Sequence, residues 1–210
     1  VENVLKNDFM SKEEIERSLN FMISDKCFLC TYHPVTLSNM SSETQVLNLL
    51  EALDDYQDHH IIFTYSNSDT NSQIIIKRIQ EYVDKNQGRC MFIPSLGQRR
   101  YFSALKYMTA VIGNSSSGII EVPSFGIPTL DIGDRQKGRI AADSVIHCGY
   151  SKEEIREGLK MVVAYGHKII DNPYYKEGTC DAILKVIKTY SLEKLVQKHF
   201  YSNCFIRKTR

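Results

Sequence analysis

The chain has 210 residues, which is enough for one large domain or two small ones with a substantial core. Its 26 Lys and Arg residues nearly balance its 25 Asp and Glu residues, and a formal net charge of +1 argues against a surface built for nucleic acid. No apolar run is long enough to cross a bilayer. We therefore expect a cytoplasmic protein without a nucleic-acid or membrane partner.

The chain begins with V-E-N-V-L-K-N-D-F-M, which contains neither a start methionine nor the core of a signal peptide. This beginning predicts a piece of a longer protein. Ser11 and Glu14 follow at the spacing of a capping box, so we expect a first helix after Ser11.

Short apolar runs then alternate with longer amphipathic segments. The runs are continuous rather than alternating, which is typical of strands that are buried on both faces. The predicted strands are 27–32, 60–65, 90–93, 110–112, 128–132 and 144–147. Helical periodicity is clearest over 46–53, 155–163 and 183–190, and further capping boxes are predicted to start at Ser42, Thr70 and Ser151.

Alternating strands and helices predict an α/β fold with a doubly wound parallel sheet. Right-handed crossovers place the loops that follow the strands along one edge of such a sheet, where ligands bind. Residues that follow the predicted strands are therefore the first candidates for a functional site.

The six cysteines include the C-F-L-C pair of Cys27 and Cys30, inside the first predicted strand. A zinc ribbon needs two such pairs on turns, and the sequence has no second pair. We expect buried, reduced thiols and no metal site. The adjacent His59 and His60 also lack the spacing of a metal-binding helix face.

Three serines follow the strand at 110–112 in I-G-N-S-S-S-G. Ser117 or Gly118 is expected to begin a helix, and the hydroxyls of Ser115 and Ser116 lie just before it. One interpretation is an ordinary helix cap. The other is a phosphate or diphosphate site made of hydroxyls and free N–H groups, with Gly118 allowing a ligand to approach closely. The spacing alone leaves both open.

Other polar residues follow neighbouring strands. His33 ends the first strand in T-Y-H-P-V and could either pack or act on a ligand. Asn67 follows the second strand, where turn chemistry is the competing explanation. Arg135 and Arg139 follow the fifth strand and could neutralise an anion. Glu121, about one turn into the serine helix, could accept hydrogen bonds from sugar hydroxyls.

Taken together, several motifs resemble the UDP-N-acetylglucosamine 2-epimerases. They are T-Y-H-P-V-T, Y-S-N-S-D-T-N, S-L-G-Q, the stretch I-G-N-S-S-S-G-I-I-E-V-P-S-F-G-I-P-T-L-D-I-G-D-R-Q-K-G-R and the late N-P-Y. The nearest resemblance is to the hydrolysing branch, which makes N-acetylmannosamine for sialic-acid synthesis. It covers nearly the whole chain, and the serine-to-arginine stretch is its most specific part.

The resemblance implies the GT-B arrangement, in which two Rossmann-like domains face each other across a cleft. The chain corresponds to the C-terminal, UDP-binding domain at 25–210, and residues 1–24 correspond to the interdomain connection and a leading helix. The N-terminal domain is not encoded in these 210 residues. It is an expected partner, and the full-length protein is expected to form a homo-oligomer.

The resemblance also implies roles for individual residues. Ser115 and Ser116 bind the diphosphate of UDP, and Arg135 binds near the phosphates or the sugar. His33 reaches the junction of sugar and diphosphate and is the expected catalytic residue of this half.

Three further residues complete the expected nucleotide site. Glu121 binds the ribose hydroxyls, Asn67 lies near the nucleotide, and backbone groups around Ile93 read the edge of the uracil.

The implied reaction eliminates UDP from UDP-N-acetylglucosamine and then adds water, without a metal or other cofactor. The acid and base carboxylates of the family lie in the other domain, so we expect this chain alone to be inactive. A non-hydrolysing epimerase, a GT-B glycosyltransferase that uses a UDP-sugar, and a non-catalytic UDP-binding module remain as alternatives.

Overall fold

The computed structural model describes residues 1–35, 38–66, 71–191 and 193. The chain divides into two compact units, Val1–Lys176 and Glu177–Arg210. The first unit contains the whole sheet and the candidate site.

Six parallel strands form one sheet in the order β3-β2-β1-β4-β5-β6. The strands are β1 (Cys27–Thr31), β2 (His60–Thr64), β3 (Cys90–Ile93), β4 (Ala110–Gly113), β5 (Thr129–Ile132) and β6 (Val145–Cys148). All six predicted strands are confirmed, and their ends differ from the prediction by at most one residue. The strand order reverses between β1 and β4, which pair directly, so this is the switch point at which open α/β sheets bind ligands.

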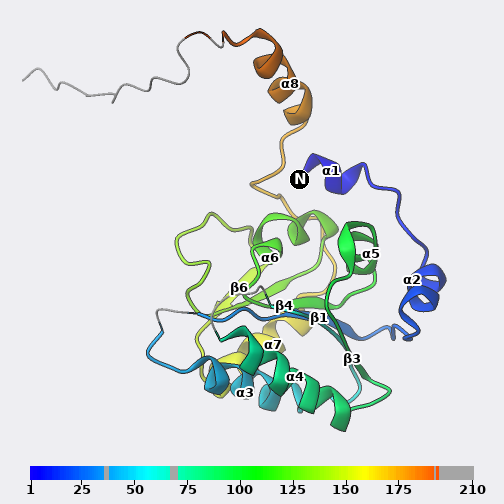
Figure 1. Ribbon diagram of the computed structural model, residues 1–210, viewed down its shortest axis with the longest axis vertical. Helices are drawn as coiled ribbons and strands as arrows, with labels where there is room; N and C mark the ends of the chain where they lie inside the picture. Colours follow the sequence, from blue (N-terminus) through cyan, green and yellow to red (C-terminus); the bar gives the residue numbers. More distant parts are fainter. Residues whose placement is uncertain (36–37, 67–70, 192, 194–210) are drawn as a thin grey trace, which may run out of the picture. The chain divides into compact units, whose positions relative to one another are not determined.

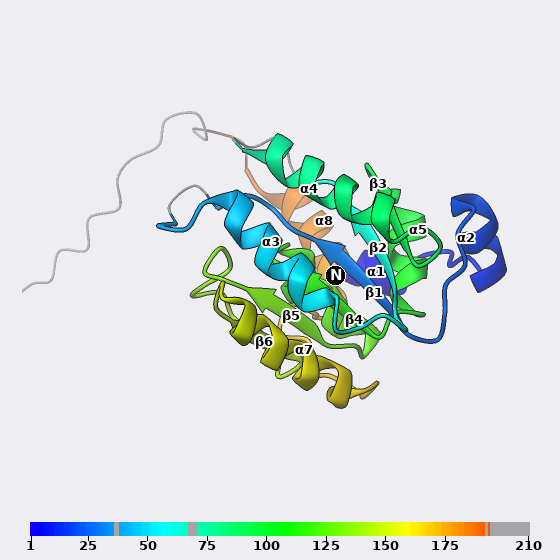
Figure 2. The same ribbon diagram turned by 90° about the horizontal axis from the view of Figure 1, so that it is seen from below.

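Helices cover both faces of the sheet (Figures 1 and 2). One face is covered by α3 (Ser42–Leu53), α4 (Ser72–Lys85) and α7 (Lys152–Tyr165), and the other by α5 (Gly97–Leu105), α6 (Ser117–Ile120) and the 3₁₀ helix η1 (Val122–Phe125). Each face has its own buried cluster, with Leu49, Ile79 and Leu159 in the first and Phe102 and Leu105 in the second. The predicted doubly wound fold is confirmed.

The first residues of the chain belong to the second cluster. Helices α1 (Glu2–Leu5) and α2 (Lys12–Leu19) precede β1, and Val4, Ile15 and Ile23 are buried with the side chains of α5. The capping box that starts α2 is confirmed, since Glu14 N–H donates to Ser11 Oγ and Ser11 N–H donates to the Glu14 carboxylate. Residues 1–24 thus pack as part of the first unit.

Two other helix starts differ from the prediction, whereas the capping box at Ser151 is confirmed. Ser41, not Ser42, caps α3: its hydroxyl accepts from Thr44 N–H, and Ser42 is buried inside the helix. Thr70 lies outside the described residues, and α4 begins after Asn71, whose side chain makes no cap hydrogen bond. The sequence S-S-E-T-Q offers two registers, and burial of Ser42 decides between them.

Strands β5 and β6 are joined without a helix, contrary to the expected alternation. Residues 133–144 form turns, and both glycines of this segment, Gly133 and Gly138, have positive φ angles of 81° and 83°. An apolar helical stripe is also missing from G-D-R-Q-K-G-R, so nothing would hold a helix against the sheet. The segment remains a loop at the carboxyl edge.

Cys27 and Cys30 are confirmed as free, buried thiols, and burial raises the pKa of both well above the usual range.

The second unit contains α8 (Thr179–Thr189), the helix expected from the periodicity of 183–190; Ile183, Val186 and Ile187 are exposed on it. Within the described parts of the chain, no helix is both long and apolar enough to cross a membrane.

Candidate functional site

The site is built where β1 and β4 end side by side. Gly113, the last residue of β4, is paired with Thr31 of β1 and has a φ of 134°, which favours glycine. A β-carbon at this position would lie 1.9 Å from the carbonyl oxygen of Thr31. The glycine thus lets the chain turn directly over the end of β1, so the loops of the two strands meet.

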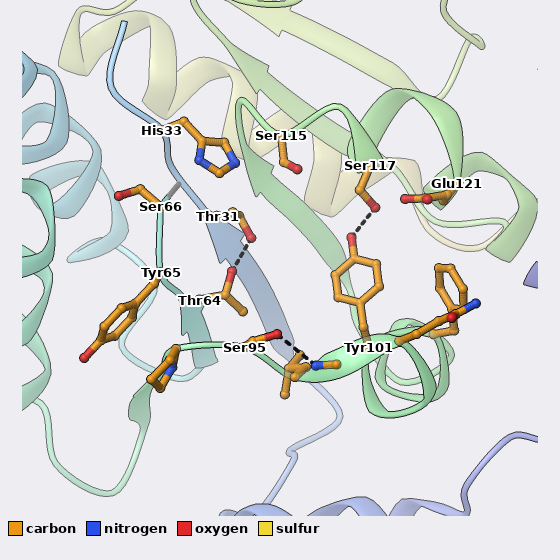
Figure 3. A pocket seen from close by; sticks show the side chains of 15 residues that line it. Thr31, His33, Thr64, Tyr65, Ser66, Ser95, Tyr101, Ser115, Ser117 and Glu121 are labelled. Carbon is orange, nitrogen blue, oxygen red and sulfur yellow. Dashed lines mark hydrogen bonds between the residues drawn. The ribbon is translucent and has the colours of Figure 1, made fainter. Parts of the chain in front are cut away.

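A cavity of about 600 Å³ opens beside this junction (Figure 3). Side chains from the ends of four strands and from the start of α5 line it. The lining residues are Thr31, His33, Thr64, Tyr65, Ser66, Pro94, Ser95, Leu96, Gly97, Gln98, Tyr101, Phe102, Ser115, Ser117 and Glu121. Of the predicted site residues, the structure brings His33, Ser115 and Glu121 together here.

Hydroxyl groups are paired inside the cavity. Thr31 and Thr64 end neighbouring strands, and their hydroxyl oxygens lie 2.6 Å apart. The Tyr101 hydroxyl lies 2.5 Å from Ser117 Oγ, and burial raises the pKa of Tyr101. The tyrosine therefore stays neutral and can donate or accept a hydrogen bond, as the serine can.

The serine loop presents polar groups that have no partner within the described residues. The backbone N–H groups of Ser115, Ser116 and Ser117 donate to no acceptor among the described residues. By contrast, Gly118 N–H donates to Ser115 O, and Ile119 N–H donates to Ser116 O. Ser115 lines the cavity; Ser116 is half-buried and outside the lining. Successive free N–H groups of this kind suit an anion.

The helix after the serines differs from the expectation. It begins at Ser117, as predicted, but α6 has a single turn and ends at Ile120. Glu121 is its C-cap residue. Pro123 follows and disfavours further α-helix before it, so the chain continues as η1. Glu121 thus lies at a helix junction, and an anion here would depend on individual N–H and hydroxyl groups more than on a helix dipole.

Gly118 also has a different role from the predicted one. It is buried, its carbonyl accepts from Thr129 Oγ1 at 2.8 Å, and a β-carbon would lie 2.6 Å from Thr129 Cγ2. The missing side chain makes room for strand β5 and not for a ligand. The expectation of close ligand approach at Gly118 is therefore wrong.

His33 is 6% exposed and follows the end of β1 (Figure 3). Its backbone is held by the buried Asn114, whose carbonyl oxygen also accepts from the Arg135 side chain at 3.3 Å. Arg135 does not line the cavity; Asn114, which is also outside the lining, links it to His33.

The remaining predicted residues lie around the cavity or outside the described part of the chain. Ile93 precedes the lining residue Pro94 and is itself outside the lining; its carbonyl accepts from Tyr65 N–H. Asn67 lies outside the described residues. Glu121 lines the cavity.

Sequence reasoning missed Thr31, Thr64, Tyr101 and Asn114. The two threonines could have been identified from the sequence, because each lies next to the last residue of a predicted strand. Tyr101 gave none, since only the packing of α5 against α6 brings it to Ser117.

A second cavity of about 420 Å³ lies at the ends of β5 and β6, lined in part by Lys137, Arg139 and His147. His147 Nδ1 lies 2.8 Å from the carboxylate of Asp131 on the paired strand, and Asp131 is 1% exposed. Burial raises the pKa of Asp131, although the bond from His147 opposes this shift.

This pair predicts a pH effect on stability. Because the pKa of Asp131 is higher in the folded chain, the folded state binds more protons just above the usual titration range, and stability falls as pH rises through it. Asp131→Asn removes this loss. We expect the melting temperature of the variant, relative to the natural chain, to increase as pH rises from about 4, where a free aspartate titrates, toward neutral pH. A constant difference across that range would contradict the prediction; Asp171→Asn, at an exposed aspartate, serves as control.

Known proteins share the sequence pattern and the fold of this chain. The family model described as UDP-N-acetylglucosamine 2-epimerase matches residues 1–188. The chain belongs to the UDP-N-acetylglucosamine 2-epimerase family. A GDP/UDP-N,N'-diacetylbacillosamine 2-epimerase (hydrolyzing) of Campylobacter jejuni is 38% identical over 144 residues, covering 68% of this chain and 38% of that protein. The polysialic acid biosynthesis protein P7 of Escherichia coli is 34% identical over 200 residues, covering 92% and 50%.

Solved 2-epimerase structures share the fold. The enzyme of Neisseria meningitidis bound to UDP-GlcNAc has a TM-score of 0.61 at 20% identity, over 84% of this chain and 48% of that one. The Methanocaldococcus jannaschii enzyme in complex with UDP-GlcNAc and UDP also has a TM-score of 0.61, at 17% identity, over 89% and 50%. This family member thus spans half or less of the length of the Campylobacter and Escherichia relatives.

Proposed function

We propose that this chain is the UDP-binding half of a hydrolysing UDP-N-acetylglucosamine 2-epimerase. The cavity at the switch point carries the proposal, because hydroxyls and the Glu121 carboxylate line it and the adjoining serine loop has N–H groups with no acceptor among the described residues. The identity to a relative named as hydrolysing supports this branch of the family. We further propose that the protein works in the cytoplasm and that its partner domain is the first half found in the relatives.

In this proposal the diphosphate lies against the serine loop. Ser115, with the N–H groups of Ser115 to Ser117, donates to its oxygens, and Ser116 contributes through its backbone more than through its half-buried side chain. Arg135 supports the loop and adds positive charge behind it. Glu121 accepts from the ribose hydroxyls. The uracil lies toward Pro94, beyond Ile93.

The reaction needs a stabilised leaving group. Elimination breaks the bond between sugar C1 and the diphosphate oxygen, and negative charge develops on the departing UDP. His33, at the cavity wall next to β1, is the group proposed to meet this charge, together with the serine loop. The C2 proton is moved by residues of the other half. Water then adds and gives N-acetylmannosamine.

A second sugar substrate is favoured by one observation. The Campylobacter relative is named for a sugar that carries two acetyl groups. The cavity at the switch point is compatible with either sugar, because it would hold the UDP moiety. Turnover of UDP-N-acetylglucosamine and of UDP-N,N'-diacetylbacillosamine by the full-length protein decides between them.

Nucleotide titration tests the proposal on the chain itself. We expect UDP to bind with micromolar-to-millimolar affinity and more tightly than UMP, because the serine loop offers donors for more than one phosphate. Isothermal calorimetry with UDP, UMP and uridine measures the contribution of each phosphate. Equal affinity for UDP and UMP would remove the diphosphate from the serine loop.

Glu121→Ala tests the ribose assignment. A carboxylate that accepts from ribose hydroxyls contributes a charged hydrogen bond, so UDP binding is expected to weaken by roughly 1.5–3 kcal/mol. Pyrophosphate, which has no ribose, is expected to bind as before. Glu153→Ala, at an exposed carboxylate on α7, is the matched control. Equal weakening of both ligands would make Glu121 a structural residue.

A further inference from the structure

Asn114 forms a closed pair with the backbone of His33. Its side-chain oxygen accepts from His33 N–H at 2.7 Å, and its side-chain nitrogen donates to His33 O at 2.8 Å. Asn114 is 0% exposed. Two hydrogen bonds to one residue fix both the position and the rotation of its backbone, so this asparagine sets the point from which the His33 side chain projects.

The backbone of Asn114 joins two other segments. Its N–H donates to Thr31 O at 3.2 Å, and its carbonyl accepts from Gln136 Nε2 at 2.8 Å and from Arg135 Nη1 at 3.3 Å. One residue therefore ties together the end of β1, the end of β4 and the loop after β5. Because each of its polar groups already bonds to the protein, Asn114 acts through its neighbours and does not bind the ligand.

His33 needs such support for a chemical reason. It lies beyond the last residue of β1, Thr31, and Pro34 after it has no N–H to donate. A buried backbone N–H or C=O without a partner is costly, and the Asn114 amide supplies a partner to both groups. Alanine at 114 would leave both without the amide.

We propose that Asn114 is a positioning residue that holds His33 in its working orientation and couples it to the loop of Arg135. The inference rests on the proposed function, in which His33 meets the charge on departing UDP. It predicts that the effect of Asn114 on turnover is transmitted through His33 and disappears when the imidazole is removed.

A double-mutant cycle in the full-length protein tests this coupling. We expect Asn114→Ala to lower kcat about tenfold or more, with a small change in UDP affinity, because the pair orients a group that acts as charge develops. In a His33→Ala background the same substitution is expected to change kcat less than about twofold. Equal effects in both backgrounds would show that Asn114 does not act through His33, and would overturn the proposal.

Asn114→Asp adds a rescue by pH. The ionised carboxylate accepts from His33 N–H but repels His33 O; when protonated it can again accept and donate, as the amide does. We expect kcat of the variant, relative to the natural protein, to recover as pH falls toward about 5. Asn86→Asp is the matched control, because the Asn86 amide also bonds on both sides, at the opposite edge of the sheet. Its relative kcat is expected to stay flat, and a flat profile for Asn114→Asp would contradict the inference.

Hydrogen exchange in the 210-residue chain gives a readout that does not depend on catalysis. The His33 amide is expected to exchange slowly in the natural chain and in Asn86→Asp, and about tenfold faster or more in Asn114→Ala. If the natural full-length protein releases no UDP from UDP-sugars, the proposed function fails. The exchange rate of the His33 amide still shows whether Asn114 holds the His33 backbone. An equally protected His33 amide in Asn114→Ala would overturn the proposal.

Discussion

Gly113→Ala is expected to prevent stable folding of the chain. The new β-carbon would lie 1.9 Å from the Thr31 carbonyl oxygen and 2.7 Å from its carbon, and both belong to the backbone of a buried central strand. A flexible side chain could move away, but β1 is held by β2 on one side and β4 on the other. We expect a loss above about 4 kcal/mol, a large part of the stability of a typical domain.

Urea denaturation followed by circular dichroism measures this loss. Gly88→Ala is the matched control, because Gly88 also has a positive φ, 93°, and a β-carbon there would meet nothing within 4 Å. The control is expected to lose only about 1–2 kcal/mol, the cost of a left-handed backbone. Similar losses for the two variants would mean that the contact with Thr31 is relieved by a shift of β4.

His33→Ala is expected to lower kcat of the full-length protein about 100-fold or more while KM changes little. A group that meets the charge on departing UDP interacts most strongly in the transition state, so its removal affects kcat more than substrate binding. UDP release in a coupled assay gives both constants.

The 210-residue chain alone is expected to bind UDP and release none from UDP-N-acetylglucosamine, because we assign the proton transfer at C2 to the other half.

Stability separates this role from a purely structural one. If His33 only ordered the loop before Pro34, His33→Ala would lower the melting temperature and UDP affinity together with kcat. His60→Ala, at the first residue of β2, where the ring bonds to Met22 O, controls for loss of a histidine. A His33→Ala protein with normal kcat would remove His33 from the mechanism.

Features that depend on near neighbours in the chain could be predicted from the sequence. Continuous apolar runs indicated six strands within a residue of their observed ends, because strands that are covered on both faces are mostly apolar. The caps at Ser11 and Ser151 were also readable, since both partners lie three residues apart. His33, Ser115 and Glu121 were found because they follow strands or belong to a specific motif.

Only the tertiary structure decided how these parts meet. The pair between Asn114 and His33 joins residues 81 positions apart, and Tyr101 reaches Ser117 only through packing of α5 beside α6. The space that Gly118 leaves for Thr129 likewise depends on β5. The sequence alone thus determined the type of fold and the edge of the sheet at which the cavity lies. Which polar groups share the cavity was decided by strand order and side-chain packing, because contacts between distant segments leave no local periodicity to read.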